Sequence, residues 1–187
     1  MALVALIPCL IAESCTDAFV IGYGTGVTAG EFSALESMQS VVVAEISRGV
    51  VEAAPLFDAG NLGASKSPKV RVQRGDAYRA LLRSEGSFDV IASEPSNPWV
   101  SGVEMLYSRE FLEAARNRLR PGGVYAQWFH TYETDRESLE LVLSTYAAVF
   151  DREAVWFAKG ADILLLALMP GAELDLDQME ARFQRAD

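Results

Sequence analysis

Short apolar runs alternate with segments of helical spacing along almost the whole chain, and this alternation limits the possible folds more than any other feature. Parallel strands need a crossover of about a dozen residues, usually a helix. The alternation therefore predicts a mostly parallel sheet with helices on both faces. The predicted strands are residues 18–22, 40–45, 69–74, 88–93, 124–129, 154–158 and 162–168. The predicted helices are residues 29–38, 47–56, 76–83, 107–119, 135–149 and 174–185.

The last two strands break the pattern, because only residues 159–161 separate them. A connection this short predicts an antiparallel hairpin at the edge of the sheet. Seven strands in this arrangement are typical of the α/β, Rossmann-like class I fold of S-adenosylmethionine-dependent methyltransferases. The 187 residues suit one domain, in which we expect a leading helix at 1–13, a core at 14–170 and a C-terminal helix at 171–187.

The charge balance argues against nucleic acid as a partner. Asp and Glu total 26 against 16 Lys and Arg, so the net charge of −10 repels phosphate backbones and mildly favours a cationic ligand. His130 is the single histidine, and Cys9 and Cys15 are the two cysteines. These numbers give little material for a Ser-His-Asp triad or a zinc site, so no metal is expected. We expect the two cysteines to be separate thiols rather than a disulfide framework.

The apolar run at residues 1–12 predicts a buried helix that packs on the domain. Pro8 interrupts it and Glu13 ends it, which leaves it short of the roughly 20 residues of a membrane span. It lacks the basic region that begins a signal peptide. No membrane association is expected for this chain, and we expect a cytoplasmic protein.

A glycine turn follows the first predicted strand. Gly22, Gly24 and Gly26 give the spacing G-x-G-x-G, which lets a backbone pass close to a ligand and bend into a helix. The dinucleotide fingerprint would need glycine where the chain has Val27, and no Gly-Lys-Ser/Thr of a P-loop follows. A glycine turn without a ligand is the structural alternative.

Acidic residues follow the next two strands. Glu45 ends the second strand, 21 residues beyond Gly24, where an acid can bind both hydroxyls of a ribose. Asp76 follows the third strand and can accept a bond from an adenine amino group. Each acid alone is often a helix cap. Together with the glycine turn they favour an adenosyl ligand.

The fourth strand runs into the segment SEPSNPW at residues 93–99, in which two prolines make a stiff loop. The loop brings a carboxylate, a hydroxyl, an amide and an indole to the ligand-binding edge, from Glu94, Ser96, Asn97 and Trp99. The alternative is a rigid connection in which Glu94 caps backbone groups.

Aromatic side chains and a histidine follow the same edge. The aromatic faces that can meet a cation are those of Trp99, Tyr107, Trp128 and Tyr132. Plain core packing is the alternative for each, and it applies most strongly to Trp128. His130, at the end of the fifth strand, can be a second base, a polar contact or a structural hydrogen-bonding residue.

These segments, in this order, resemble the polyamine aminopropyltransferases, the spermidine synthase family, and especially bacterial spermidine-synthase-like proteins. The resemblance runs from about Leu3 to Phe150 and rests on VIGYGTGVTAG, VVVAEIS, RGDA, FDVIASEPSNPWVSGVEMLYSREF and LRPGGVYAQW. It implies a domain that binds S-adenosylmethionine or its decarboxylated form as donor and a small amine as acceptor. The family is often dimeric, so a homodimer is one expected assembly. The implied donor-binding residues are Gly22, Gly24, Thr25, Gly26, Glu45, Asp76 and Ala77.

The chain departs from the family pattern at three positions. In the family the fourth strand leads into a D-x-x-D-P loop, whose first Asp is thought to take a proton from the attacking amine or to orient it. Glu94 and Asn97 stand at the two Asp positions here, and Thr25 stands where the glycine turn usually has Asp. Glu94 can act as a base but is one methylene longer, and Asn97 supplies no charge. We also expect the N-terminal β-lobe of the family to be missing.

Three interpretations stay open. The first is an aminopropyltransferase-like enzyme with Glu94 as base and the acceptor contacts Ser96, Asn97, Trp99 and Tyr132. The second is a small-molecule methyltransferase, although Val20 stands where many methyltransferases carry an acid. The third is a catalytically inert donor-binding module or a fragment of a longer protein, which Asn97 and the expected absence of the lobe favour.

Overall fold

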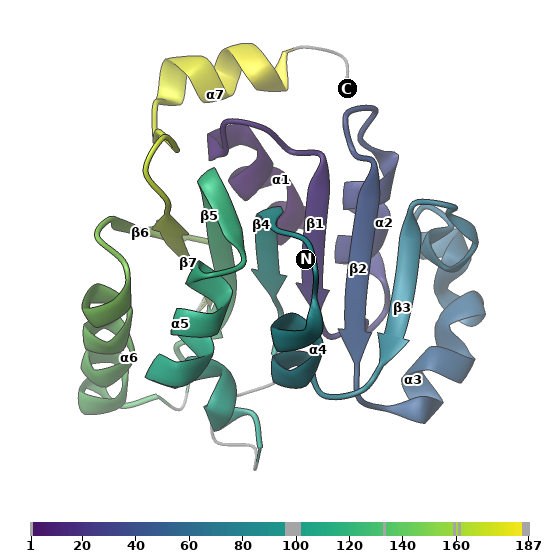
Figure 1. Ribbon diagram of the computed structural model, residues 1–187, viewed down its shortest axis with the longest axis horizontal. Helices are drawn as coiled ribbons and strands as arrows, with labels where there is room; N and C mark the ends of the chain where they lie inside the picture. The colour runs from purple at the N-terminus through teal and green to yellow at the C-terminus, as the bar shows by residue number, and fades with distance from the viewer. Residues whose placement is uncertain (1, 96–101, 133, 159, 161, 185–187) are drawn as a thin grey trace.

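The computed structural model describes residues 2–95, 102–132, 134–158, 160 and 162–184. Within these residues the strands form one seven-stranded sheet with the order β3-β2-β1-β4-β5-β7-β6 (Figure 1). Strands β1 to β5 run parallel, and β7 runs antiparallel to both β5 and β6. This confirms the predicted α/β fold and its edge hairpin. The strands are β1 (Asp17–Ile21), β2 (Ser40–Glu45), β3 (Val70–Arg74), β4 (Phe88–Ser93), β5 (Leu119–His130), β6 (Glu153–Phe157) and β7 (Asp162–Leu168).

Helices cover both faces of the sheet, because the inner strands are buried on both sides, whereas the edge strands β3 and β6 are partly exposed. One core lies under α1 (Ala2–Ile11), α2 (Val27–Ala34) and α7 (Leu176–Phe183). The other lies under α4 (Ala77–Arg83), α5 (Arg109–Arg116) and α6 (Arg136–Val149). In Figure 1, α4 lies in front of the sheet and α1 and α2 lie behind it. No helix in the described ranges combines the length and apolarity that crossing a bilayer takes.

Several helices are shorter than the sequence pattern predicts, and local chemistry explains where they end. The helix predicted at 47–56 is α3 (Arg48–Ala53), followed by the 3₁₀ turn η1 (Ala54–Gly60). Pro55 lacks the N–H that would continue α-helical bonding. Two further 3₁₀ turns are η2 (Ala64–Lys66) and η3 (Glu104–Tyr107). The helix predicted at 107–119 starts only at α5, because the Ser108 hydroxyl accepts a bond from the Phe111 N–H and caps it.

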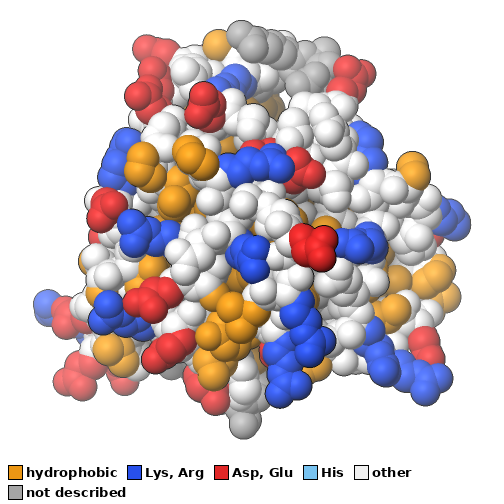
Figure 2. Space-filling view, in the orientation of Figure 1, with side chains coloured by type: hydrophobic (Ala, Val, Ile, Leu, Met, Phe, Trp, Pro, Cys, Tyr) orange, Lys and Arg blue, Asp and Glu red, His pale blue; other side chains and the backbone are white. Residues whose placement is uncertain are grey.

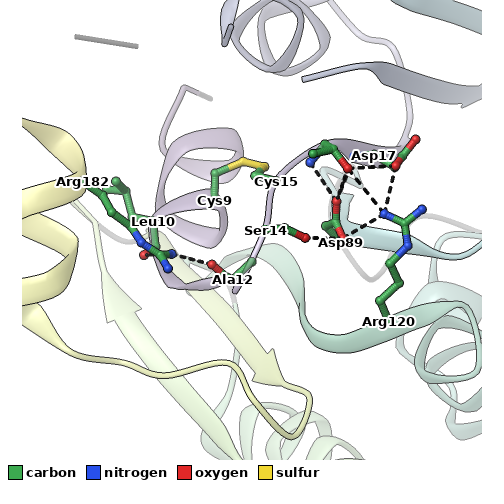
Figure 3. Close-up of a disulfide and its surroundings, with 10 residues drawn as sticks. Cys9, Leu10, Ala12, Ser14, Cys15, Asp17, Asp89, Arg120 and Arg182 are labelled. Carbon is green, nitrogen blue, oxygen red and sulfur yellow. Dashed lines mark hydrogen bonds and ion pairs between the residues drawn. A yellow bond between two sulfur atoms is a disulfide. The ribbon is translucent and has the colours of Figure 1, made fainter. Parts of the chain in front are cut away.

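A disulfide joins Cys9 of α1 to Cys15, which precedes β1 (Figure 3). The expectation of two separate thiols was therefore wrong. The chain turns directly after α1, where the Ala12 N–H donates to the Pro8 carbonyl, and this turn brings Cys15 back beside the helix. The spacing of the two residues in the sequence does not reveal such a turn. Arg182 of α7 donates to the carbonyls of Leu10 and Ala12 and ties α7 to the same corner.

The carboxylate of Asp89 connects three strands at the amino edge of the sheet (Figure 3). It accepts bonds from the Thr16 and Asp17 N–H groups at 2.7 and 3.0 Å, and from the Ser14 and Thr16 hydroxyls at 2.9 Å each. The Arg120 guanidinium of β5 bridges Asp89 and Asp17 at 3.0 and 2.9 Å. Burial alone would raise the pKa of Asp89, but these hydrogen bonds lower it below its usual value. One side chain thus fixes β1, β4 and β5 relative to one another.

Replacing Asp89 should lower the stability of the fold strongly. Asp89→Ala leaves two backbone N–H groups, two hydroxyls and a guanidinium without their shared acceptor, so the free energy of unfolding should fall by about 3 kcal/mol or more. Asp151→Ala is the control, because the Asp151 side chain is 79% exposed and pairs with Arg116 at 3.6 Å. It should change stability by less than about 1 kcal/mol. Urea unfolding of both variants measures the difference, and equal losses would contradict the role given to Asp89.

The same residue should make stability depend on pH in the acid range. The pKa of Asp89 is lower in the folded chain than in the unfolded chain, so the unfolded chain binds the proton more readily. The stabilisation is therefore complete above the unfolded value of about 3.9 and is lost as the pH falls through the lower folded value. Urea unfolding between pH 2 and pH 7 should show a smaller acid loss in Asp89→Asn than in the wild type.

Candidate functional site

The predicted site residues from three strands meet at the carboxyl edge of the sheet. Ile21, at the end of β1, is level with Ala44 of β2 and with Ser93 of β4. Gly22 and Glu94 follow directly, and the Gly22 N–H donates to the Ala44 carbonyl at 2.9 Å. A Cβ atom on Gly22 would lie 3.7 Å from the Glu94 carbonyl oxygen. The glycine turn, the acid of β2 and the acid after β4 therefore form one cluster.

The glycine turn needs its glycines. Gly22, Gly24 and Gly26 have φ angles of +84°, +53° and +79°, a left-handed region that other residues rarely adopt. Gly26 also stands at the start of α2, where a Cβ atom would lie 2.6 Å from Asn61 Nδ2 and 2.8 Å from the Tyr23 ring. At Gly24 a Cβ atom would meet nothing within 4 Å. The turn is packed closely at Gly26 and open at Gly24.

The carboxylate of Glu45 is held between two backbone N–H groups. Its Oε2 accepts from Tyr23 at 2.8 Å, and its Oε1 accepts from Ser47 at 2.6 Å. The residue is only 6% exposed. A carboxylate offers about four acceptor positions, so these two bonds leave each oxygen able to accept another. Glu45 braces the glycine turn and can still accept bonds from paired hydroxyls.

Asp76 lies beside this cluster and caps a helix, which is the structural alternative stated above for the acids at strand ends. Its Oδ1 accepts from the Arg79 N–H at 2.9 Å and caps α4, whose first residue is Ala77. The neighbouring Gly75 N–H donates to the Glu45 carbonyl at 2.8 Å, so the β3 loop borders the acid of β2. The cap uses one position of a carboxylate that is otherwise exposed to solvent.

Glu94 has an unsatisfied oxygen. Its Oε1 is buried and has no hydrogen-bond partner among the described residues. Burial raises the pKa of the Glu94 carboxyl, and the hydroxyl of Thr28, at the start of α2, offsets part of that rise. A carboxyl with a raised pKa accepts a proton more readily than an exposed carboxylate does.

The remaining predicted residues divide into three groups. Tyr132 is 44% exposed, and its ring lies 5.1 Å from the His130 ring, at the end of β5. Tyr107 is buried in the core under α5, with its ring edge-on to Phe129 at 5.8 Å, and burial raises its pKa. Trp128 packs against the core under α1 and α2. The residues that lie outside the described part of the chain are Ser96, Asn97 and Trp99.

Sequence reasoning missed Asn61. This residue is 1% exposed; its Nδ2 donates to the Thr25 carbonyl at 2.8 Å, and its Oδ1 accepts from the Ala64 N–H at 3.0 Å. Asn61 lies in the connection between η1 and η2 and holds the glycine turn in place from there. In the sequence this connection is notable only for its turn-forming residues. No local pattern relates position 61 to position 25, so the sequence carries no signal for this contact.

The profile of the spermine/spermidine synthase domain matches residues 2–158. The chain belongs to this family. The match includes the glycine turn, Glu45, Asp76 and Glu94, so the whole cluster lies in the part of the chain shared with the family.

Curated members of the family are similar in sequence to part of this chain. A polyamine aminopropyltransferase from Nitrosomonas europaea is 32% identical over 109 residues, which are 58% of this chain and 33% of the relative. A spermidine synthase from Dictyostelium discoideum is 30% identical over 129 residues, or 66% of this chain and 45% of the relative. The chain thus spans between a third and a half of the length of these relatives.

Solved structures support the same fold. A spermidine synthase in complex with the transition-state analogue AdoDATO superposes with a TM-score of 0.85 at 18% identity, over 99% of this chain and 65% of that one. Human methyltransferase-like protein 13 in complex with SAH gives a TM-score of 0.76 at 21% identity, over 96% of this chain and 86% of that one. The fold of this chain is therefore shared with a spermidine synthase and with a methyltransferase-like protein.

The close approach of Asn61 to α2 predicts an unusual response to alanine. Alanine normally stabilises a helix interior by about 1 kcal/mol over glycine. A Cβ atom on Gly30 of α2 would instead lie 1.9 Å from the Asn61 carbonyl oxygen, so Gly30→Ala should destabilise the chain by at least ~2 kcal/mol. Gly60→Ala is the matched control, because a Cβ atom there would meet nothing within 4 Å. Thermal unfolding compares them; a stabilised Gly30→Ala would contradict the packing.

Proposed function

We propose that the chain binds an S-adenosyl sulfonium donor at the carboxyl ends of β1, β2 and β4, and that it supports transfer of an aminopropyl group to a small amine. The observation that carries this proposal is the convergence of the glycine turn, Glu45 and Glu94 at one edge, within the residues matched by the family profile. The donor is S-adenosylmethionine or its decarboxylated form, and it takes part as a substrate.

The donor side of the proposal uses the open part of the glycine turn. Gly24 has no Cβ atom, and the space where one would stand is open. The sulfonium portion of a donor can therefore approach the backbone of Gly24 and Thr25 closely. The free acceptor positions on Glu45 suit the two ribose hydroxyls. Asp76 and Ala77, beside the loop that contacts Glu45, are assigned to the adenine. A cationic donor also agrees with the net charge of −10.

The acceptor side uses Glu94. A primary amine has a pKa near 10 and arrives mostly as an ammonium, so it must lose a proton before its lone pair can attack. The lone pair then forms the C–N bond while the C–S electron pair passes to sulfur, and the sulfonium becomes a neutral thioether. Glu94 takes the first proton, and its raised pKa makes it a better acceptor than an exposed carboxylate. Of the proposed acceptor contacts, Tyr132 is at this edge, and Ser96, Asn97 and Trp99 remain sequence-based assignments.

A methyltransferase is the second candidate, because the fold likeness includes a methyltransferase. Val20 of β1 is buried where many such enzymes carry an acid, which favours the first proposal. Donor preference separates the two. In calorimetric titrations we expect decarboxylated S-adenosylmethionine and methylthioadenosine to bind more tightly than S-adenosylmethionine. A preference for S-adenosylmethionine would support the methyltransferase, and no binding by a folded chain would leave an inert module.

Glu94→Gln should separate catalysis from binding. Glutamine keeps the shape but cannot accept the proton, so the rate constant for transfer should fall about a hundredfold or more. The affinity for methylthioadenosine should stay within twofold, because the donor rests on the glycine turn. The wild-type rate should rise with pH through the raised pKa of Glu94, since the base acts when it is deprotonated, and the variant should lack this rise. Glu85→Gln, at an exposed position, is the control. Equal rates in the two variants would rule out Glu94 as the base.

Location and assembly are part of the proposal. We propose a cytoplasmic location and a homodimer, the latter from the family resemblance alone. The disulfide between Cys9 and Cys15 is of the kind that persists in oxidising compartments, so it argues against the cytoplasmic part of this proposal. Alkylation of thiols in freshly lysed cells, followed by mass spectrometry, tests the location. Modified cysteines would agree with a reducing cytoplasm, and a protected pair would argue for an oxidising compartment.

A further inference from the structure

A histidine and an aspartate form a pair at the carboxyl end of β5. His130 is the last residue of β5 and Asp162 the first of β7, and the two are direct partners in the antiparallel ladder. His130 Nδ1 lies 2.6 Å from Asp162 Oδ1. The side chains are 25% and 29% exposed, so the pair is sheltered but open to a ligand. The proposed function above does not use this pair.

The pair lies on the same face of the sheet as Glu94. Ala92 of β4, Ala126 of β5 and Leu164 of β7 all belong to the core under α1 and α2. Side chains alternate along a strand, so Glu94, His130 and Asp162, each displaced by an even number of residues, follow on that face. The contact between Glu94 and Thr28 of α2 agrees with this side.

The spacing along the strands fits a single small substrate. Ser93 is level with Gln127, so Glu94 is level with the next residue of β5, two positions before His130. Two residues of rise and one strand spacing separate the backbones of Glu94 and His130 by roughly 8 Å. Two side chains that extend from these points can bracket one nitrogen atom.

The hydrogen bond to Asp162 determines what the imidazole can do. A carboxylate at Nδ1 favours the tautomer with its proton on that nitrogen, which leaves Nε2 as an acceptor. It also offsets the positive charge that the ring gains on taking a proton. The rings of Tyr132 and Trp128 lie 5.1 and 6.3 Å from the imidazole. Tyr132 is 44% exposed and can offer an aromatic face to an ammonium group.

We propose that His130, positioned by Asp162, is a second proton acceptor for the attacking amine, an inference that rests on the proposed function. Glu94 takes the first proton from the ammonium. The neutral nitrogen then attacks the carbon bonded to sulfur, the C–S electron pair goes to sulfur, and the nitrogen becomes a secondary ammonium. Nε2 accepts one of its two remaining protons, which gives a neutral secondary amine and an imidazolium beside Asp162. Before attack, an N–H···Nε2 bond helps to aim the lone pair at the carbon.

The single histidine of the chain makes a direct test by NMR possible. The ring nitrogens of ¹⁵N-labelled protein give one set of imidazole signals. We expect the tautomer with the proton on Nδ1, and we expect the Nε2 signal to move when 1,4-diaminobutane is added to the complex with methylthioadenosine. Asp162→Asn should weaken the tautomer preference. Asp177→Asn, at an exposed position on α7, should leave all imidazole signals unchanged.

Kinetics provide the second measurement. His130→Gly should lower the rate constant for transfer about a hundredfold, and added imidazole should restore part of it. Asp162→Asn should lower it about tenfold or more. The affinity for methylthioadenosine should not change in either variant. A merely structural histidine would not be rescued by imidazole.

The outcomes separate this inference from the proposed function. If the wild type transfers the group and His130→Gly does so at the same rate, the second acceptor is overturned and the transferase stands. The same holds if the diamine binds and the Nε2 signal stays in place. If neither the donor nor the diamine binds a folded chain, both proposals fall.

Discussion

The buried carboxylate of Asp89 is the constraint on which the site depends, although it lies at the opposite edge of the sheet. Its bonds to Thr16 and Asp17 fix where β1 starts relative to β4, and the Arg120 bridge adds β5. The register of these strands at the amino edge determines which residues lie side by side at the carboxyl edge. A slip of one residue between β1 and β4 would turn Glu94 to the other face, away from Thr28 and the glycine turn. The positions of Gly22 and Glu94 therefore follow from an interaction five residues earlier in β4.

Asp89 lies near the start of β4 and Glu94 lies directly after its end, and their pKa values shift in opposite directions for one physical reason. Burial disfavours the charge on both. Asp89 receives bonds from N–H and hydroxyl groups and from a guanidinium, which lower its pKa despite burial. Glu94 Oε1 receives none among the described residues, so burial prevails and its pKa rises. The chain thus has a fully satisfied carboxylate at the amino edge of the sheet and an under-satisfied one at the carboxyl edge, where the proposed donor site lies.

The sequence predicted what depends on periodicity and strand order. The alternation of strands and helices, the short 159–161 connection and the acids at strand ends led to the observed sheet and to the grouping of Gly22, Glu45 and Glu94. It did not predict contacts between segments that are distant in sequence and lack a pattern. Asn61 reaches the glycine turn through the tertiary fold, and Cys15 meets Cys9 because of the turn after α1. The His130–Asp162 pair depends on the register of β5 against β7, whereas the sequence predicted only the hairpin that joins β6 to β7.

Charge movement in the proposed reaction indicates where carboxylates help. Figure 2 shows acidic and basic side chains mixed over the face that carries α4, so the acidic excess of the chain is not concentrated there. Salt screening limits the interactions of exposed charges to distances of about 8–10 Å, and the carboxylates at the site therefore matter more than the net charge.

During transfer, positive charge leaves sulfur and appears on nitrogen. A carboxylate close to sulfur would stabilise the substrate more than the transition state, whereas one close to nitrogen does the reverse. In the proposed order of steps, Glu94 has taken its proton before the nitrogen attacks, so the carboxylate that acts on the nitrogen is Asp162, through His130. Glu45 holds the ribose.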